Sequence, residues 1–146
     1  MTLGKVRLSV FLALSFAAGS LITARFSADR NVNAQDKRVF ELRTYHTLPG
    51  RLPALQARFR DHTLKIFERH GMTNVAYWTP LDAPASENTL IYILAHESRE
   101  AAKKSWDAFR SDPEWQQVAK ASEADGKIVE KLESVFMGST DYSPMK

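Results

Sequence analysis

Hydrophobic and polar positions alternate with a period of two along several segments of the chain, and this pattern predicts β-strands. Residues 39–46 read VFELRTYH, residues 73–79 read TNVAYWT, and residues 128–137 read IVEKLESVFM. Residues 89–96 read TLIYILAH and are apolar on both faces, which is typical of a central strand that is covered on both sides. The sequence therefore predicts four strands.

Between these strands the apolar residues recur at helical spacing. A helix is expected over residues 52–70, with Pro53 in its first turn and Gly71 just beyond its end. A second helical region starts at Ser98, a favourable N-cap, and is interrupted at Pro113. Asp112 can cap the helical piece that follows. Trp106 lies on the apolar stripe of this region, so we expect it, like Trp115, to be part of the core.

The order strand, helix, strand, strand, helix, strand is that of the ferredoxin-like arrangement. We therefore predict an α+β fold, a βαββαβ unit in which a four-stranded antiparallel sheet carries both helices on one face. The opposite face would still hold large apolar groups, and an exposed patch of that kind usually marks an interface. A second copy of the sheet is the simplest cover, so we expect a homodimer whose two sheets close a barrel. The residues expected on this face are Tyr45, Trp78, Tyr92, Leu94 and Phe136.

The first segment of the sequence has the character of a secretory signal peptide. Lys5 and Arg7 precede the uncharged run LSVFLALSFAA at residues 8–18. That run is shorter than the roughly 20 residues of a spanning helix. We assign residues 1–34 to a signal peptide and its cleavage region, with cleavage after Ala34 or, alternatively, after Ala24. Residues 35–38 form a linker and residues 39–146 the domain. The protein is then exported, periplasmic or extracellular in a bacterium, without a membrane span after cleavage. The alternative is an uncleaved N-terminal membrane anchor.

The charge and the cysteine content exclude several classes of function. The chain has a net charge of +3, but residues 35–146 hold sixteen basic and sixteen acidic residues. The domain therefore lacks the basic excess that nucleic-acid binding needs. The absence of cysteine excludes disulfides, cysteine-bound zinc and thiol catalysis.

The most suggestive polar residues are Glu41, Arg43 and Tyr45, which a period of two places on one face of the first strand. If Phe40 and Leu42 face the helices, this trio faces the interior of the barrel. Arg43 could there hold an anionic ligand through a forked hydrogen bond. The alternative is structural: Glu41 and Arg43 pair with residues of a neighbouring strand such as Lys131 and Glu133.

Aromatic and histidine residues supply the remaining candidates. Trp78 is a pocket candidate for a flat ligand, and His62 completes the predicted ligand-binding set of Glu41, Arg43, Tyr45, Trp78 and His62. We expect His46 and His96 to end two neighbouring strands that run the same way. A two-histidine metal site is conceivable at that rim, but no complete ligand set is visible and no metal is predicted.

The chain from about Val39 to Met137 also resembles the NIPSNAP family. The resemblance rests on short motifs in a fixed order: FELRTY at 40–45, LPGRL at 48–52, ERHG at 68–71, YWT at 77–79 and DPEW at 112–115. It implies a dimeric α/β barrel of two ferredoxin-like units. Members of the family are described in vesicle transport and mitochondrial quality signalling, and related barrel groups include monooxygenases and haem-handling enzymes. The bacterial-looking leader argues against carrying mitochondrial roles over to this chain.

No phosphate loop, serine nucleophile motif, HExxH motif or EF-hand loop is present, which disfavours a hydrolase or a nucleotide enzyme. The first functional hypothesis is an exported homodimeric module that binds a small molecule or a protein partner, with no particular cofactor indicated. The alternative is a cofactor-independent monooxygenase-like or haem-handling enzyme, which rests on analogy between barrels. A third interpretation is an interaction protein without a ligand.

Overall fold

The computed structural model describes residues 38–146, and the expected signal peptide and nearly all of the linker lie outside the described residues. The elements follow the predicted order of strands and helices. They are β1 (Val39–Thr47), α2 (Leu52–Arg58), η1 (Phe59–Thr63), α3 (Leu64–Arg69), β2 (Thr73–Trp78), α4 (Ala85–Asn88), β3 (Thr89–His96), α5 (Arg99–Ser111), α6 (Pro113–Ser122) and β4 (Val129–Gly138). No helix within residues 38–146 is long and apolar enough to cross a membrane.

The four strands form one sheet in the order β2-β3-β1-β4, and every neighbouring pair is antiparallel. This confirms the predicted ferredoxin-like arrangement. The expectation that the strands of His46 and His96 run the same way is wrong. His46 lies opposite Thr89, whereas His96 lies opposite Val39 at the other end of the pair. The two imidazoles therefore lie at opposite ends of the sheet, and they cannot share a metal ion.

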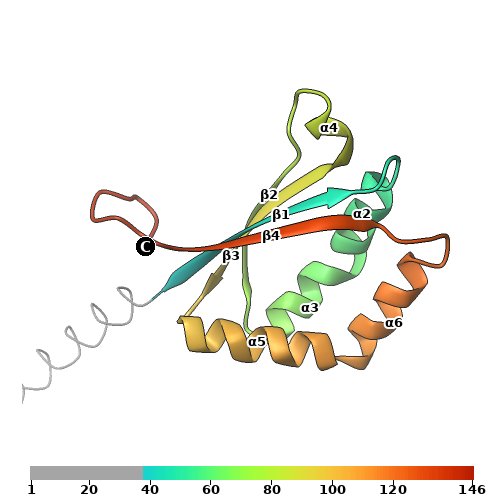
Figure 1. Ribbon diagram of the computed structural model, residues 1–146. Helices are drawn as coiled ribbons and strands as arrows, with labels where there is room; N and C mark the ends of the chain where they lie inside the picture. The colour runs from blue at the N-terminus through green and yellow to red at the C-terminus, as the bar shows by residue number, and fades with distance from the viewer. Residues whose placement is uncertain (1–37) are drawn as a thin grey trace, which may run out of the picture. The chain divides into compact units, whose positions relative to one another are not determined.

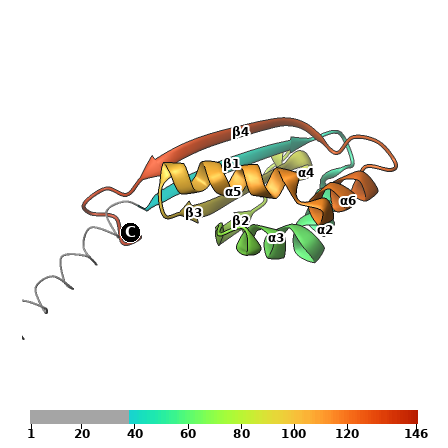
Figure 2. The ribbon, with the colours of Figure 1, turned by 90° about the horizontal axis from the view of Figure 1, so that it is seen from below.

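Helices α2, α3, α5 and α6 lie together on one side of the sheet, as Figures 1 and 2 show from two directions. The core fills the space between these helices and the sheet. Phe67 packs against the rings of Trp106 and Phe109 from α5, so the two helical regions contact each other as well as the sheet. The largest buried apolar residues of this core are Leu55, Phe59, Ile66, Phe67, Met72, Tyr92, Leu94, Trp106, Phe109 and Ile128.

The prediction of which strand face meets the helices is wrong. Cross-strand partners point to the same face, and β1 pairs Glu41 with Leu94 and Arg43 with Tyr92. Because Leu94 and Tyr92 are fully buried in the core, the charged residues of β1 face the helices too. Of the residues expected on the opposite face, Tyr45, Tyr92, Leu94 and Phe136 lie on the helical side. The alternation of residues along β1 was predicted correctly, but the two faces were assigned the wrong way round. Charged residues can face the core because they form hydrogen bonds and ion pairs with one another there.

The opposite face still presents an apolar surface, made of different residues. The strand register places Leu42, Ile91, Ile93, Val135 and Trp78 on it, and we call this set the outer sheet face. Val135 is 54% exposed and Trp78 is 50% exposed, while the other three are partly exposed. A row of five large apolar residues across four strands leaves a surface suited to burial against another sheet.

The predicted helix over residues 52–70 is interrupted by η1, a π-helical turn. The Leu64 amide donates to the Phe59 carbonyl five residues earlier, and the Thr63 hydroxyl donates to the Arg58 carbonyl at 3.0 Å. The segment therefore holds one more residue per turn than an α-helix, and the side chains after it are rotated relative to those before it. The helix ends at Arg69, and Gly71 just beyond it has a φ of +75°, in the left-handed region that favours glycine.

Asp112 joins the two helical regions. One carboxylate oxygen caps α6 by accepting from the Glu114 amide at 2.8 Å, as predicted. The other accepts from Arg69 and from His70, both at 2.6 Å. These contacts, the Arg69 guanidinium first, hold the pKa of Asp112 well below its usual range. The start of α6 is thus fixed to the end of α3.

Candidate functional site

Glu41 is the centre of a buried polar group that lies between β1 and α5. Its side chain is 1% exposed and accepts four hydrogen bonds. Oε1 accepts from Arg43 Nη1 at 2.7 Å and from Ser134 Oγ at 2.6 Å. Oε2 accepts from Trp106 Nε1 at 2.7 Å and from His96 Nε2 at 3.1 Å. We call Glu41 and these four donors, Arg43, His96, Trp106 and Ser134, the Glu41 cluster.

The cluster keeps the Glu41 carboxylate ionised inside the protein. Burial on its own would raise the pKa of Glu41, because a charge loses hydration in the interior. The hydrogen bonds from His96, Ser134 and Trp106, together with the charge of Arg43, outweigh that cost and lower the pKa to about 2. The predicted structural alternative had named Lys131 and Glu133 as partners. The partners on the neighbouring strands are instead Ser134 and His96, because the register places Glu133 opposite Thr44 and Lys131 opposite His46.

The Arg43 guanidinium also contacts other residues within the protein. Its guanidinium lies 4.1 Å from the centre of the Trp106 ring, and Nη2 donates to the Tyr45 hydroxyl at 3.4 Å. Burial would lower the pKa of Arg43, but the phenols of Tyr45 and Tyr92 and the Glu41 carboxylate raise it above its ordinary value. The trio predicted from the β1 pattern therefore does come together. The three residues form hydrogen bonds with one another, and Glu41 also accepts from residues of α5, β3 and β4.

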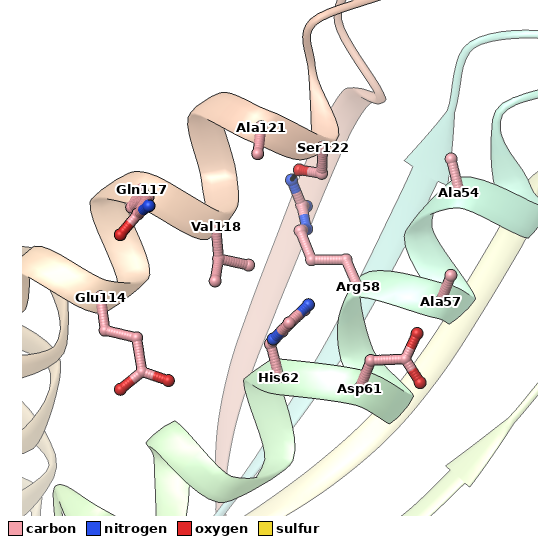
Figure 3. A pocket seen from close by; sticks show the side chains of 10 residues that line it. All are labelled: Ala54, Ala57, Arg58, Asp61, His62, Glu114, Gln117, Val118, Ala121 and Ser122. Carbon is pink, nitrogen blue, oxygen red and sulfur yellow. Dashed lines mark hydrogen bonds between the residues drawn. The ribbon is translucent and has the colours of Figure 1, made fainter.

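A separate pocket of about 560 Å³ lies between the α2–η1 segment and α6 (Figure 3). We call it the η1–α6 pocket. Figure 3 shows the side chains of Arg58 and His62 extending from α2 and η1 towards α6. His62, predicted from the sequence, thus lines this pocket, whereas the other four predicted residues do not. The pocket is lined by Ala54, Ala57, Arg58, Asp61, His62, Glu114, Gln117, Val118, Ala121 and Ser122.

Arg58 is the residue of this pocket that sequence reasoning missed. It is 7% exposed, although arginine is rarely buried unless it is paired. Nη1 donates to Ser122 Oγ at 3.3 Å and lies 3.6 Å from the Glu123 carboxylate, while Nε is buried without a partner among the described residues. Burial, the largest influence, lowers the pKa of Arg58. The only sequence signal was its place next to the apolar stripe of residues 52–67.

Arg51 connects the start of α2 to the end of α6, at the end of the η1–α6 pocket opposite Asp112. Its Nη2 donates to the carbonyl of Gly126 at 2.9 Å and to that of Ser122 at 3.4 Å. Asp112 fixes the start of α6 and Arg51 fixes the chain just after its end. The two helical walls of the pocket are therefore held together at both ends.

Trp78 lines a second, smaller pocket of about 270 Å³. Phe59 and Tyr77 contribute aromatic walls, and Leu64 and Leu90 contribute aliphatic ones. Tyr77 is held by a hydrogen bond from its hydroxyl to Asn74 Oδ1 at 2.5 Å, and burial raises the pKa of Tyr77 above its ordinary value. Trp78, which the strand register places on the outer sheet face, borders this apolar space, and its predicted role in ligand binding stays a prediction.

Comparisons with known proteins agree on the family and the fold. The NIPSNAP family model matches residues 40–144. A NIPSNAP family protein of unknown function from Agrobacterium tumefaciens is similar in structure, with a TM-score of 0.65 and 22% identity over 76% of this chain and 96% of that chain. A NIPSNAP-like domain protein from Burkholderia xenovorans has a TM-score of 0.65 and 16% identity over 75% and 90% of the two chains.

A more distant neighbour is an enzyme. SnoaB, a cofactor-independent oxygenase from Streptomyces nogalater, has a TM-score of 0.51 and 14% identity over 74% of this chain and 98% of that chain. At these identities the likeness concerns the fold alone. A search of curated proteins finds none that matches the sequence.

Proposed function

The chain belongs to the NIPSNAP family. We propose that it is an exported homodimeric domain that binds a small molecule. The observation that carries the binding part is the η1–α6 pocket. It combines a volume sufficient for a small ligand, an apolar strip made of Ala54, Ala57, Val118 and Ala121, and polar side chains that could fix the orientation of a ligand. The π-helical turn in its wall adds to this, since such turns often occur at functional sites.

The dimer is proposed from the outer sheet face. Val135 and Trp78 are each about half exposed, and Leu42, Ile91 and Ile93 lie beside them. Burying such a row stabilises an assembly by roughly 25 cal/mol for each Å² removed from water. A two-fold pair of sheets covers the same patch on both copies at once. The partner of this surface is therefore a second copy of the chain.

Export is proposed from the signal-peptide pattern of residues 1–34. The intact mass of the protein recovered from the periplasm or medium tests it. We expect a mature chain that begins at Gln35. A mass that retains residues 1–24 would support the membrane-anchored alternative and overturn cleavage.

Native mass spectrometry of the gently purified protein tests dimer and ligand together. We expect a dimer that carries extra mass, which would also provide the ligand for identification. A bare dimer that accepts no compound would shift the function to binding a protein partner. A monomer would overturn the dimer, because the outer sheet face would then need another cover.

A second candidate function is a cofactor-independent oxygenase of the kind represented by SnoaB. The observation that favours it is the aromatic pocket at Trp78, which suits a flat aromatic substrate. Oxygen uptake with quinol substrates and titration with haem test this alternative. Turnover that is lost in Trp78→Ala would support it, and no uptake and no haem binding would remove it.

A further inference from the structure

Building on the proposed small-molecule function, we propose that the η1–α6 pocket takes a molecule with one carboxylate at the end of an apolar body, such as a medium-chain fatty acid. The carboxylate would lie on Arg58 and the apolar body along the alanine-rich wall. Three features of the pocket support this ligand: the unused hydrogen-bonding capacity of Arg58, the placement of the acidic side chains, and the shape of the apolar lining.

Arg58 has hydrogen-bonding capacity to spare. A guanidinium carries five N–H donors. Its polar contacts within residues 38–146 are the Ser122 hydroxyl at 3.3 Å and the Glu123 carboxylate at 3.6 Å, both long for charged partners, and its guanidinium also lies 5.4 Å from the centre of the Trp115 ring. Glu123 is itself used elsewhere, since its Oε1 accepts from the Ile128 amide at 3.2 Å. A buried arginine with loose partners favours an added carboxylate, which can accept two parallel hydrogen bonds.

The acidic residues of the pocket do not oppose this assignment. Glu114 is bound by Arg69, whose Nη1 donates to it at 2.8 Å, so its charge is compensated. Asp61 is exposed, and water and salt screen an exposed charge strongly. Arg58, by contrast, is buried, where charges act at higher strength. For an anion at the buried end of the pocket, the attraction to the Arg58 guanidinium therefore exceeds the repulsion from the acidic residues at the rim.

The apolar lining suits a narrow ligand. Ala54 and Ala57 on α2 and Val118 and Ala121 on α6 supply the apolar part of the lining (Figure 3). Alanine side chains allow two helices to lie close while a slot remains between them. A linear or flat apolar group fits such a slot, and each methylene that it buries adds to the hydrophobic stabilisation of the complex.

The test is a titration of the ¹⁵N-labelled protein, followed by amide chemical shifts, with octanoate and with 1-octanol as probes. We expect saturable shifts in α2, η1 and α6 with octanoate, and at least about tenfold weaker binding of 1-octanol, which lacks the charge. Arg58→Gln should remove the preference for octanoate. Ala121→Trp should block both probes, and Lys120→Gln, on the same helix but outside the pocket lining, should bind as the unchanged protein does.

The outcomes separate this inference from the proposed function. Equal binding of the two probes, or a preference that survives in Arg58→Gln, would overturn the carboxylate assignment while small-molecule binding stands. If Arg58→Gln fails to fold, the test rests on Ala121→Trp, which should fold because Ala121 is exposed. Chemical shifts that probes still cause in Ala121→Trp would show that the probe binds elsewhere, and would overturn the site. A protein isolated with bound mass that neither probe displaces overturns the ligand class alone, whereas no bound mass and no shifts overturn both proposals.

Discussion

The ionised state of Glu41 predicts a specific loss of stability in acid. The pKa of this carboxyl falls from an ordinary 4.5 to about 2 on folding, because four donors bind its charged form. A group with a lowered folded-state pKa stabilises the protein fully above its unfolded pKa, and this contribution is lost as the pH falls through the folded value. The full contribution is about 3 kcal/mol, of which about 2 kcal/mol is lost between pH 6 and pH 3.

The measurement is urea unfolding followed by circular dichroism at pH 6, 5, 4 and 3, at one protein concentration because a dimer couples stability to concentration. Other carboxyls, Asp112 among them, also have a lowered pKa. The informative quantity is therefore the difference in pH dependence between the unchanged protein and Glu41→Gln. We expect Glu41→Gln to be less stable at pH 6 and to lose about 2 kcal/mol less on acidification.

Glu41→Gln leaves buried donors without a charged acceptor and could fail to fold. Trp106→Phe then serves as the second variant, since it removes one donor to Glu41 and keeps most of the packing. It should show a smaller acid loss than the unchanged protein. Equal pH dependence in the unchanged protein and in both folded variants would refute the reasoning, because the Glu41 cluster would then not lower the pKa of Glu41.

Three further predictions concern other parts of the molecule. Val135→Arg should convert the proposed dimer to a monomer in sedimentation velocity, whereas Lys104→Glu on the exposed side of α5 should not; a dimer that persists in Val135→Arg would exclude this face as the interface. Trp78→Ala should weaken binding of a planar aromatic compound by tenfold or more, a loss that Leu81→Ala should not reproduce, and equal affinities would exclude the smaller pocket. Asp112→Ala should lower the Tm through loss of the α6 cap and the contacts to α3, and an unchanged Tm would contradict the role given to this residue.

The fold could be predicted because each strand and helix is indicated by the pattern of residues within its own segment. The alternation in residues 39–46 and the helical stripe that begins at Leu52 each identify an element without reference to the rest of the chain. Their order then restricts the topology. The caps at Ser98 and Asp112 were predicted for the same reason, since a cap depends on residues two or three positions away.

The site could be predicted only in part, because burial and strand direction are not local. Glu41 and Arg43 have the pattern of a solvent-facing strand until Trp106, on a helix sixty-five residues from Glu41, supplies a donor to the carboxylate. Arg58 has only a weak signal, its place beside the apolar stripe, because its partners Ser122 and Glu123 lie more than sixty residues further along the chain. His62 lines the η1–α6 pocket, and its predicted role in ligand binding stays a prediction.

The ties at the two ends of α6 have a consequence for how fast the η1–α6 pocket can exchange its contents. With Asp112 at one end and Arg51 at the other, the walls cannot swing apart as a hinged lid does. A ligand would enter a space whose shape already exists, so little chain entropy would be lost on binding. Association should then be limited by diffusion and orientation, and residence time by the contacts within the pocket alone.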